Sequence, residues 1–377
     1  MTSIGIVGGG IGGVAAGLAL HQAGIQATVY ERAPELREVG AGMMLWPNAT
    51  RVLKQLGVLD RIARHSGPNE TFLVRASDGD ILMNIALGQF DVPALCTRRS
   101  DLLAGLLAEL PPERIKLGHE LTGLEQTARG VRLSFARGAS VEHDAVIGAD
   151  GIRSLVRTQL FGKIKPVYRG YTVWRGVANY GGGAVPAGLN SETWGRGHRF
   201  GILNTGHDRF TWYATANGAE HRADSSQGRQ AELVRMFADW HEPVPDLIAA
   251  TPADEILKNP AYDLPPLRRW GSGRVTLLGD AAHPCTPNLG QGGCMALEDA
   301  LVLAKCFSRA ASIEGALRRY ESMRRPRTRH IQKRSLLMGT IGQWENRVVV
   351  AGRETVTSLL PARLFEHNLR RLYAYQS

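Results

Sequence analysis

The chain has 377 residues, 44% of them hydrophobic, which is enough material for two lobes with separate cores. No apolar run approaches the roughly 18 residues of a membrane span, and the four cysteines form no Cys-x-x-Cys pair. The sequence therefore predicts no integral membrane association, metal site or disulfide framework. The net charge of +10 comes without a recognition helix or stacking aromatics, so we expect no nucleic-acid partner. The absence of a membrane span and of paired cysteines favours a cytoplasmic protein, which we expect to be a monomer or a homodimer.

The first feature along the chain is a strand, a glycine-rich turn and a helix. Residues 4–7 are apolar, Gly8, Gly10 and Gly13 follow in Gly-x-Gly-x-x-Gly spacing, and a helix is expected over residues 11–24. Gly8 permits the tight turn, Gly10 lets the backbone approach a pyrophosphate, and Gly13 allows close helix–strand packing. The free N–H groups and dipole of the helix N-terminus favour an anion, so this segment predicts dinucleotide binding.

An acid follows the next predicted strand, over residues 27–30. Glu31 lies at about the spacing expected of a ribose-hydroxyl acceptor. An acid at this point disfavours a 2′-phosphate, so FAD or NAD fits this site better than NADP. Arg32, beside it, either flanks the adenosine or is an ordinary surface arginine.

The middle of the chain alternates helices and strands and then changes character. From residue 171 to 217 it is rich in β-branched and aromatic residues, which favours a second lobe built on an antiparallel sheet. The predicted helices cover residues 48–64, 99–110 and 227–240, and the predicted strands lie within 70–92, with a hairpin turn at 78–80, and at 131–135 and 145–147.

A second polar loop lies far from the first in sequence. Residues 273–278 are predicted to form a buried strand that leads to Asp280, and a helix is expected over residues 294–304. A strand-end carboxylate followed by a helix N-terminus forms a second polar cradle. The loop between them contains His283, Pro287, Gly290, Gln291 and Gly292.

Three motifs together resemble the group A flavoprotein monooxygenases, the FAD-dependent aromatic hydroxylases. They are the glycine turn, the Gly-Asp motif that contains Asp280, and Asp150-Gly151-Ile152-Arg153, which is similar to the Asp-Gly motif of that family. The motifs occur in the family's order and span almost the whole chain. The nearest subgroup contains salicylate, urate and hydroxynicotinate hydroxylases and zeaxanthin epoxidase-like enzymes.

The resemblance implies an α/β fold with an α+β second lobe, similar to para-hydroxybenzoate hydroxylase. A Rossmann-like FAD-binding domain would carry an inserted antiparallel-sheet substrate domain. We expect the FAD-binding domain over residues 1–70, 97–170 and 270–326, the substrate-binding domain over residues 71–96 and 171–269, and a C-terminal helical segment over residues 327–377.

The resemblance also implies the cofactors and the reaction. FAD would be bound, whereas NADH or NADPH would bind transiently, because the sequence has just one Rossmann fingerprint. Hydride would reduce the flavin, O₂ would add at C4a, and the hydroperoxide would transfer oxygen to a small aromatic or heteroaromatic substrate. The implied cofactor-binding residues are Gly8, Gly10, Gly13, Glu31, Arg32, Gly42, Arg99, Asp150, Arg153, Asp280, Gly290, Gln291 and Gly292.

Several of these residues have specific expected roles. Asp280 would accept a hydrogen bond from the ribityl chain, and Arg99 would contact the flavin side chain or the pyrophosphate. Gly42, in the small-residue loop 40–42, would lie against the isoalloxazine. The carbonyl of Pro287 would lie near C4a, or Pro287 would only stiffen the loop. His283 is expected to orient the loop.

The substrate would lie between the second-lobe sheet and the flavin, with Arg199, Trp212 and Tyr213 as candidates. Pro287, Arg199 and Tyr213 are the candidate catalytic residues. Aromatic residues on strands are more often core residues, and Arg199 could equally form a structural ion pair. The run Arg209-Phe210-Thr211-Trp212 departs from the Arg-Phe-Tyr run of urate hydroxylases, which argues against urate as the substrate.

Two further interpretations remain open. The basic residues between 318 and 334 predict a solvated helix face interrupted at Pro326, with an anionic partner or membrane surface as the alternative. A flavin-dependent oxidoreductase without oxygenation, or a non-catalytic FAD- or NAD-binding sensor, is the alternative to a monooxygenase.

Overall fold

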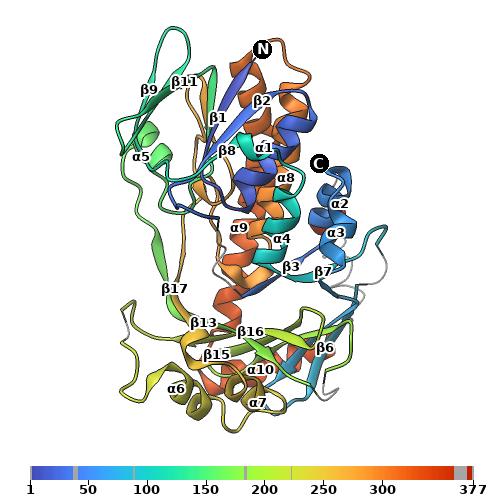
Figure 1. The fold of residues 1–377 in the computed structure, drawn as a ribbon. Helices are drawn as coiled ribbons and strands as arrows, with labels where there is room; N and C mark the ends of the chain where they lie inside the picture. Colours follow the sequence, from blue (N-terminus) through green and yellow to red (C-terminus); the bar gives the residue numbers. More distant parts are fainter. Residues whose placement is uncertain are drawn as a thin grey trace.

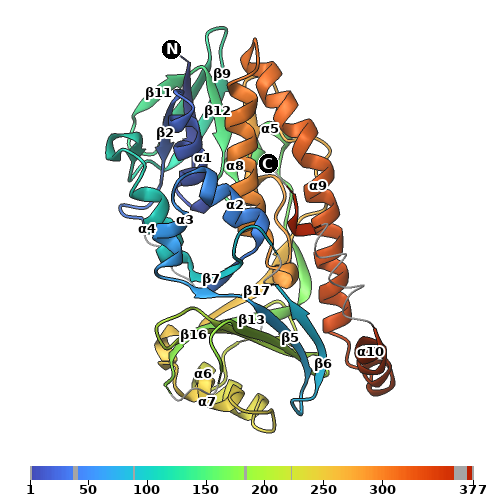
Figure 2. The same cartoon turned by 90° about the vertical axis from the view of Figure 1, so that its right-hand side faces the viewer.

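The computed structural model describes residues 2–36, 41–87, 90–181, 185–221, 223–360 and 372–375. These residues form two stacked lobes, one built on a parallel sheet and the other on a larger, mostly antiparallel sheet (Figure 1). The long helix α9 (Ile313–Gly342) runs along one side of both lobes (Figure 2). Within the described ranges, no helix combines the length and the apolar character that crossing a bilayer requires.

The first lobe has a parallel sheet at its centre. Strand β1 (Ser3–Val7) lies in the middle of this sheet, and its Ile4 and Ile6 side chains are fully buried. Helix α1 (Ile11–Gln22) packs against α8 (Gly292–Phe307), where Gly12 and Ala296 allow a close approach. The strand order is β18 (Val275–Leu277), β12 (Ala145–Gly148), β1 (Ser3–Val7), β2 (Gln26–Tyr30) and β8 (Ile115–Lys116).

Two small antiparallel sheets accompany this core. The first has the order β11 (Ser140–His143), β10 (Val131–Phe135) and β9 (Leu121–Gln126). The second, which lies next to the other lobe, has the order β3 (Gly42–Leu45), β7 (Leu95–Arg98) and β4 (Gly67–Pro68).

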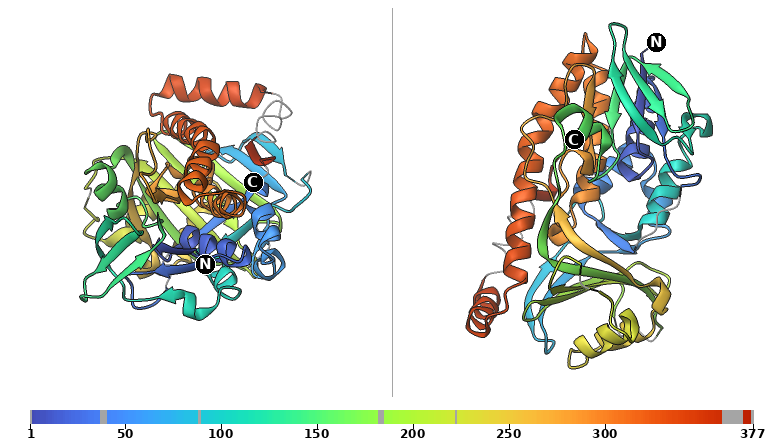
Figure 3. Two further views of the ribbon diagram at one scale, coloured as in Figure 1. Left: turned by 90° about the horizontal axis from the view of Figure 1, so that it is seen from above. Right: turned by 90° about the vertical axis from the view of Figure 1, so that its left-hand side faces the viewer.

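The second lobe is a twisted sheet whose described strands pair antiparallel, except that β14 (Leu189–Trp194) and β5 (Thr71–Ala76) pair in parallel. Helices α6 (Gly228–Met236) and α7 (Val244–Ala249) cover one face of this sheet, and the other face looks toward the first lobe (Figures 1 and 3). The strand order is β17 (Leu257–Asp263), β13 (Val167–Asn179), β16 (Arg209–Asn217), β15 (His198–Asn204), β14 (Leu189–Trp194), β5 (Thr71–Ala76) and β6 (Ile81–Ala86).

The fold class predicted from the sequence is confirmed, and two local predictions are wrong. The single helix expected over residues 48–64 is two helices, because Gly57 adopts φ 74° between them. The basic helix continues through Pro326, which is exposed and removes one backbone donor, while packing of α9 against α8 holds its course. The remaining helices are α2 (Pro47–Gln55), α3 (Leu59–Ala63), α4 (Arg99–Leu107), α5 (Leu155–Phe161) and α10 (Arg347–Leu359).

Candidate functional site

A cavity of 1130 Å³ lies between the two lobes. One wall comes from the turn before α1, the loop after β12 and the loop between β18 and α8, and the facing wall is the open face of the large sheet. The sequence-predicted residues that line it are Gly10, Gly42, Arg99, Arg199, Tyr213, Asp280, Pro287, Gly290 and Gly292. The predicted residues that do not line it are Gly8, Gly13, Glu31, Arg32, Asp150, Arg153 and Gln291.

The glycine turn brings the N-terminus of α1 to the cavity. Gly8 has φ 111°, and a Cβ there would lie 2.4 Å from the carbonyl oxygen of Ala149. A Cβ on Gly13 would lie 1.9 Å from the carbonyl oxygen of Gly8, so both positions require glycine. None of the described side chains caps α1 and no acid lies in its first turn, which leaves its end open to an anion.

Glu31 supports the glycine turn from behind. Its carboxylate accepts hydrogen bonds from the backbone N–H of Gly9 at 2.7 Å and of Ala33 at 2.9 Å. A carboxylate has about four acceptor positions, so a ribose hydroxyl could still bind to it. Arg32 is exposed at the surface.

Asp150 caps the helix that follows the Asp-Gly motif. It accepts hydrogen bonds from Ser154 Oγ at 2.5 Å and from the backbone N–H of Leu155 at 2.7 Å. Arg153 is exposed, whereas Arg157 is buried and donates to the carbonyl of Ala281 at 2.8 Å. Arg157, which sequence reasoning missed, therefore ties the Asp-Gly motif to the Gly-Asp motif. Its position on the buried face of a short helix was the only available signal.

Asp280 is the acid whose carboxylate remains available to a ligand in the cavity. It follows β18, lines the cavity and is exposed, and none of the described residues donates a hydrogen bond to it. A Cβ on Gly292, at the start of α8, would lie 3.9 Å from Asp280 Oδ1. The free carboxylate thus lies beside a second helix N-terminus, which no side chain in the described part of the chain caps.

The turn before α8 shapes the cavity wall. Pro287 begins a short 3₁₀ turn (Pro287–Leu289), and its carbonyl accepts the Gly290 N–H at 2.9 Å while Gly290 adopts φ 61°. The Gln291 side chain points away from the cavity, because its Oε1 accepts from Asn48 Nδ2 at 3.0 Å. Only the backbone of Gln291 is thus available to a ligand.

Gly42 and Arg99 lie on the side of the cavity formed by β3 and α4. The Gly42 N–H donates to Thr211 Oγ1 at 3.1 Å, and a Cβ on Gly42 would lie 2.7 Å from the same oxygen. Arg99 is the first residue of α4 and lines the cavity. Gly40, the first residue of the predicted small-residue loop, lies outside the described residues.

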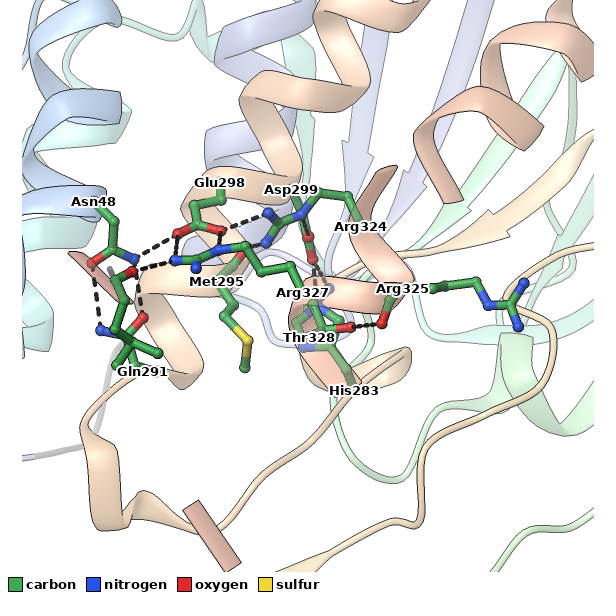
Figure 4. A network of polar contacts seen from close by, with 12 residues as sticks. Asn48, His283, Gln291, Met295, Glu298, Asp299, Arg324, Arg325, Arg327 and Thr328 are labelled. Atoms are coloured by element: carbon green, nitrogen blue, oxygen red, sulfur yellow. Dashed lines mark hydrogen bonds and ion pairs between the residues drawn. The ribbon is translucent and has the colours of Figure 1, made fainter. Parts of the chain in front are cut away.

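A buried polar network joins α8 and α9 next to the turn that precedes α8 (Figure 4). Arg324 pairs with Glu298 and with Asp299, each at 2.6 Å, and Arg327 pairs with Glu298 at 2.6 Å. His283 Nε2 lies 2.5 Å from Asp299, so this histidine is held inside the network and does not line the cavity. The prediction of a solvated basic face is therefore wrong for Arg324 and Arg327, whose charges neutralise carboxylates of α8.

Arg199 is the buried cation of the large-sheet wall. It is 2% exposed, and its Nη1 donates to Glu192 Oε1 at 2.8 Å. Its Nε donates to Gln343 Oε1 at 2.9 Å, and its Nη2 donates to Asn288 Oδ1 at 2.6 Å. The arginine thus forms a structural ion pair at the edge of the cavity. Glu192 was not identified from the sequence, because only the pairing of β14 with β15 brings it to Arg199.

Tyr213 lines the cavity from β16, the strand that pairs with the Arg199 strand β15. It pairs in register with Gly201, and a Cβ on Gly201 would lie 2.1 Å from the tyrosine ring. Burial, together with the nearby Glu192 carboxylate, raises the pKa of Tyr213 well above its ordinary value. The phenol therefore stays neutral at physiological pH.

Trp212, another predicted substrate-pocket residue, lies on the opposite face of β16. It is fully buried, stacks on Phe200 with ring centroids 5.4 Å apart and donates to Thr251 Oγ1 at 2.7 Å. Trp212 is therefore a core residue under α6 and α7, and its assignment to the pocket is wrong.

The cavity therefore joins two uncapped helix ends, a free carboxylate and a polar sheet wall. The FAD binding domain family matches residues 1–177 and 201–335 of the chain. The chain belongs to this family, and relatives that match most of its length are named as FAD-dependent hydroxylases and aromatic monooxygenases. The resemblance inferred from the three motifs is confirmed.

Relatives of this flavoprotein cover almost its whole length. The Aurachin C monooxygenase/isomerase of Stigmatella aurantiaca is 38% identical over 370 residues, which are 97% of this chain and 96% of the relative. The 2-heptyl-3-hydroxy-4(1H)-quinolone synthase of Pseudomonas aeruginosa is 33% identical over 360 residues, which are 94% of each chain. The crystal structure of Klebsiella pneumoniae HpxO complexed with FAD and uric acid superposes with a TM-score of 0.93 at 28% identity, covering 99% of this chain and 97% of that one.

The residues that surround the cavity of this flavoprotein fit FAD. The glycine cradle would be filled by any Cβ, the N-termini of α1 and α8 are uncapped, and Asp280 has no partner among the described residues. Two positive helix ends suit the diphosphate and an electron-rich ring, and a free carboxylate suits sugar hydroxyls.

Proposed function

We propose that the protein is a monooxygenase that consumes NAD(P)H and O₂ and inserts one oxygen atom into a small aromatic or heteroaromatic substrate. The observation that carries this proposal is the free Asp280 carboxylate beside an uncapped helix end, in a cavity whose opposite wall holds Arg199 and Tyr213. When bound, FAD would supply the chemistry, accepting hydride and activating O₂ at C4a. The protein supplies binding, orientation and exclusion of water.

The first lobe would hold the cofactor. We propose that the N-terminus of α1, beginning beyond Gly10, receives the pyrophosphate and that Glu31 accepts a ribose hydroxyl. Asp280 would accept from the ribityl chain, and Arg99 would contact the pyrophosphate or the flavin side chain. The backbone of Gly292 would face the flavin ring, where the α8 dipole favours negative charge.

The remaining predicted cofactor residues would act indirectly. Asp150 fixes the start of α5 and so the loop that lines the cavity, and Arg157 joins that loop to Ala281. Arg32 and Arg153 are exposed and lie outside the cavity wall. We propose that these two arginines contact the transiently bound NAD(P)H.

The Arg199–Glu192 pair favours a neutral ring over an anionic one at its part of the wall. Glu192 compensates the charge of Arg199, so the pair offers hydrogen bonds without a net positive charge. Tyr213 adds a neutral hydroxyl on the same wall. A heteroaromatic carbonyl or ring N–H matches these groups better than a carboxylate does. The name of the Pseudomonas relative specifies a quinolone, which has both groups, and we propose this ring class for the present protein.

A substrate panel tests the function. The FAD-loaded protein is given aromatic acids, purines and 4-quinolones with NADH or NADPH, and the rate of NAD(P)H oxidation and the product mass are measured. We expect a quinolone to stimulate oxidation and to gain one oxygen atom. Stimulated oxidation without oxygen in any product would instead identify a flavin oxidoreductase, and a colourless protein that refuses added FAD would identify a non-catalytic protein.

A further inference from the structure

The cavity extends beyond the polar wall into a region that the proposed reaction does not use. We call this region the apolar arm. It lies between the β5–β6 edge of the large sheet and the helices α9 and α10. Its lining side chains are Phe72, Val74, Met83 and Ile85 on the sheet, Met338 and Ile341 on α9, and Val349 and Val356 on α10.

The sheet side of the apolar arm is a fixed surface. Phe72 pairs in register with Ile85, and Val74 pairs with Met83, so the four side chains form two adjacent rows. All four side chains are buried. On the neighbouring strand Val74 pairs with Glu192, the partner of Arg199. The apolar arm is therefore continuous with the polar wall.

The helix side of the apolar arm is held by one arginine. Arg353 of α10 donates to the carbonyls of Gly195 at 3.1 Å and Ile341 at 3.3 Å, and its guanidinium lies 5.3 Å from the Trp194 ring centroid. These contacts fix α10 over the end of α9 and the sheet. Val356 lies two turns beyond Val349 on the same side of α10, about 10 Å along its axis.

We propose that the apolar arm binds an aliphatic chain carried by the aromatic substrate, while the ring lies at Arg199 and Tyr213. This inference rests on the proposed function for the position of the ring. The lining residues of the apolar arm offer no free charged group, since Arg353 is occupied by carbonyls. Val356 is 59% exposed, so an aliphatic chain in the arm would shield a side chain that the fold itself leaves in water.

A homologous series of ligands tests the proposal. 2-Methyl-, 2-butyl- and 2-heptyl-4-quinolone are titrated into the FAD-loaded protein without NAD(P)H, and the dissociation constant is measured from tryptophan fluorescence, since Trp46, Trp194 and Trp344 line the cavity. Each buried methylene should tighten binding about fourfold. Equal dissociation constants for the methyl and heptyl compounds would overturn the proposal.

Two variants of the same helix sharpen the test. Val356→Asp places a charge in the apolar arm, and we expect it to weaken binding of the heptyl compound at least about tenfold and to leave the methyl compound unchanged. Val348→Asp is the control, because Val348 is 79% exposed and does not line the cavity. If both variants weaken heptyl binding equally, the assignment of the arm fails.

The binding series also separates this inference from the proposed function. Chain-length-dependent binding without oxygenated product supports the apolar arm and refutes the monooxygenase proposal. Oxygenation that is independent of chain length refutes only the apolar arm. A dimer that both variants convert to a monomer, with no chain-length dependence, would assign this face to a second copy of the chain.

Discussion

Glu298 on α8 and Arg324 on α9 form an ion pair of 2.6 Å in which neither side chain is exposed. Asp299, the next residue on α8, pairs with the same guanidinium at 2.6 Å. Although burial opposes ionisation, the charges of Arg324 and Arg327 hold the pKa of Glu298 below its ordinary value. The network thus fixes the long helix to α8, whose other end forms part of the cavity wall.

Replacing Arg324 should destabilise the protein strongly. Arg324→Met leaves Glu298 and Asp299 with less compensation in a buried site, and we expect the free energy of unfolding to fall by about 3–5 kcal/mol. Urea denaturation measures this loss. Arg329→Met, on the exposed side of the same helix, is the control and should change stability by less than about 0.5 kcal/mol. Similar losses in both variants would contradict the buried network.

Tyr320 should make stability depend on alkaline pH. Its hydroxyl donates to the Leu277 carbonyl at 3.2 Å, and burial, with the nearby Asp299 charge, raises its pKa well above the ordinary value. The phenol is therefore neutral in the folded state, whereas above about pH 10 the unfolded chain ionises and is favoured.

A Tyr320→Phe variant isolates this effect. We expect it to be less stable than the parent by about 1 kcal/mol near pH 8, because one hydrogen bond is lost. The difference in free energy of unfolding between the two proteins should shrink as the pH rises through about 10. Above that pH the unfolded parent gains stability by ionising Tyr320, whereas the variant has no such group. Urea unfolding at several pH values measures this difference. A difference that is constant with pH would show that Tyr320 does not carry the alkaline loss.

Asp280 should dominate retention of FAD. Asp280→Ala removes a charged hydrogen bond of about 1.5–3 kcal/mol, so we expect the dissociation constant of FAD to rise by about one to two orders of magnitude. Equilibrium titration of the apoprotein measures it, with the exposed Asp254→Ala as control. Unchanged FAD retention in Asp280→Ala would remove this residue from the site.

Pro287 should help to ensure that each NAD(P)H oxidised yields hydroxylated product. Its carbonyl oxygen accepts the Gly290 N–H at 2.9 Å, and the turn that this bond closes forms part of the cavity wall. Pro287→Ala should leave FAD binding nearly intact but admit water, which favours unproductive oxidation. The ratio of H₂O₂ to NAD(P)H consumed should therefore rise. If peroxide and product yields match those of the parent, Pro287 is only a turn residue.

The local features of the site could be read from the sequence because they depend on backbone conformation. Gly8, at φ 111°, and the hairpin around Gly79, at φ 102°, lie where glycine is required. The strand that leads to Asp280 follows from its apolar run. Orientation was harder to predict: Gln291 belongs to the predicted loop, yet its side chain binds Asn48 far away in sequence.

The sequence by itself determined the family, most of the order of the elements and the glycine turns at Gly8 and Gly79, since each depends on residues close together in the chain. Only the tertiary structure decided which face of β16 meets the cavity, so that Tyr213 lines it and Trp212 does not. It likewise decided that Arg324 is buried among carboxylates of another helix. Strand alternation and helix periodicity define two faces, but the choice between them depends on what packs there, which is a long-range property.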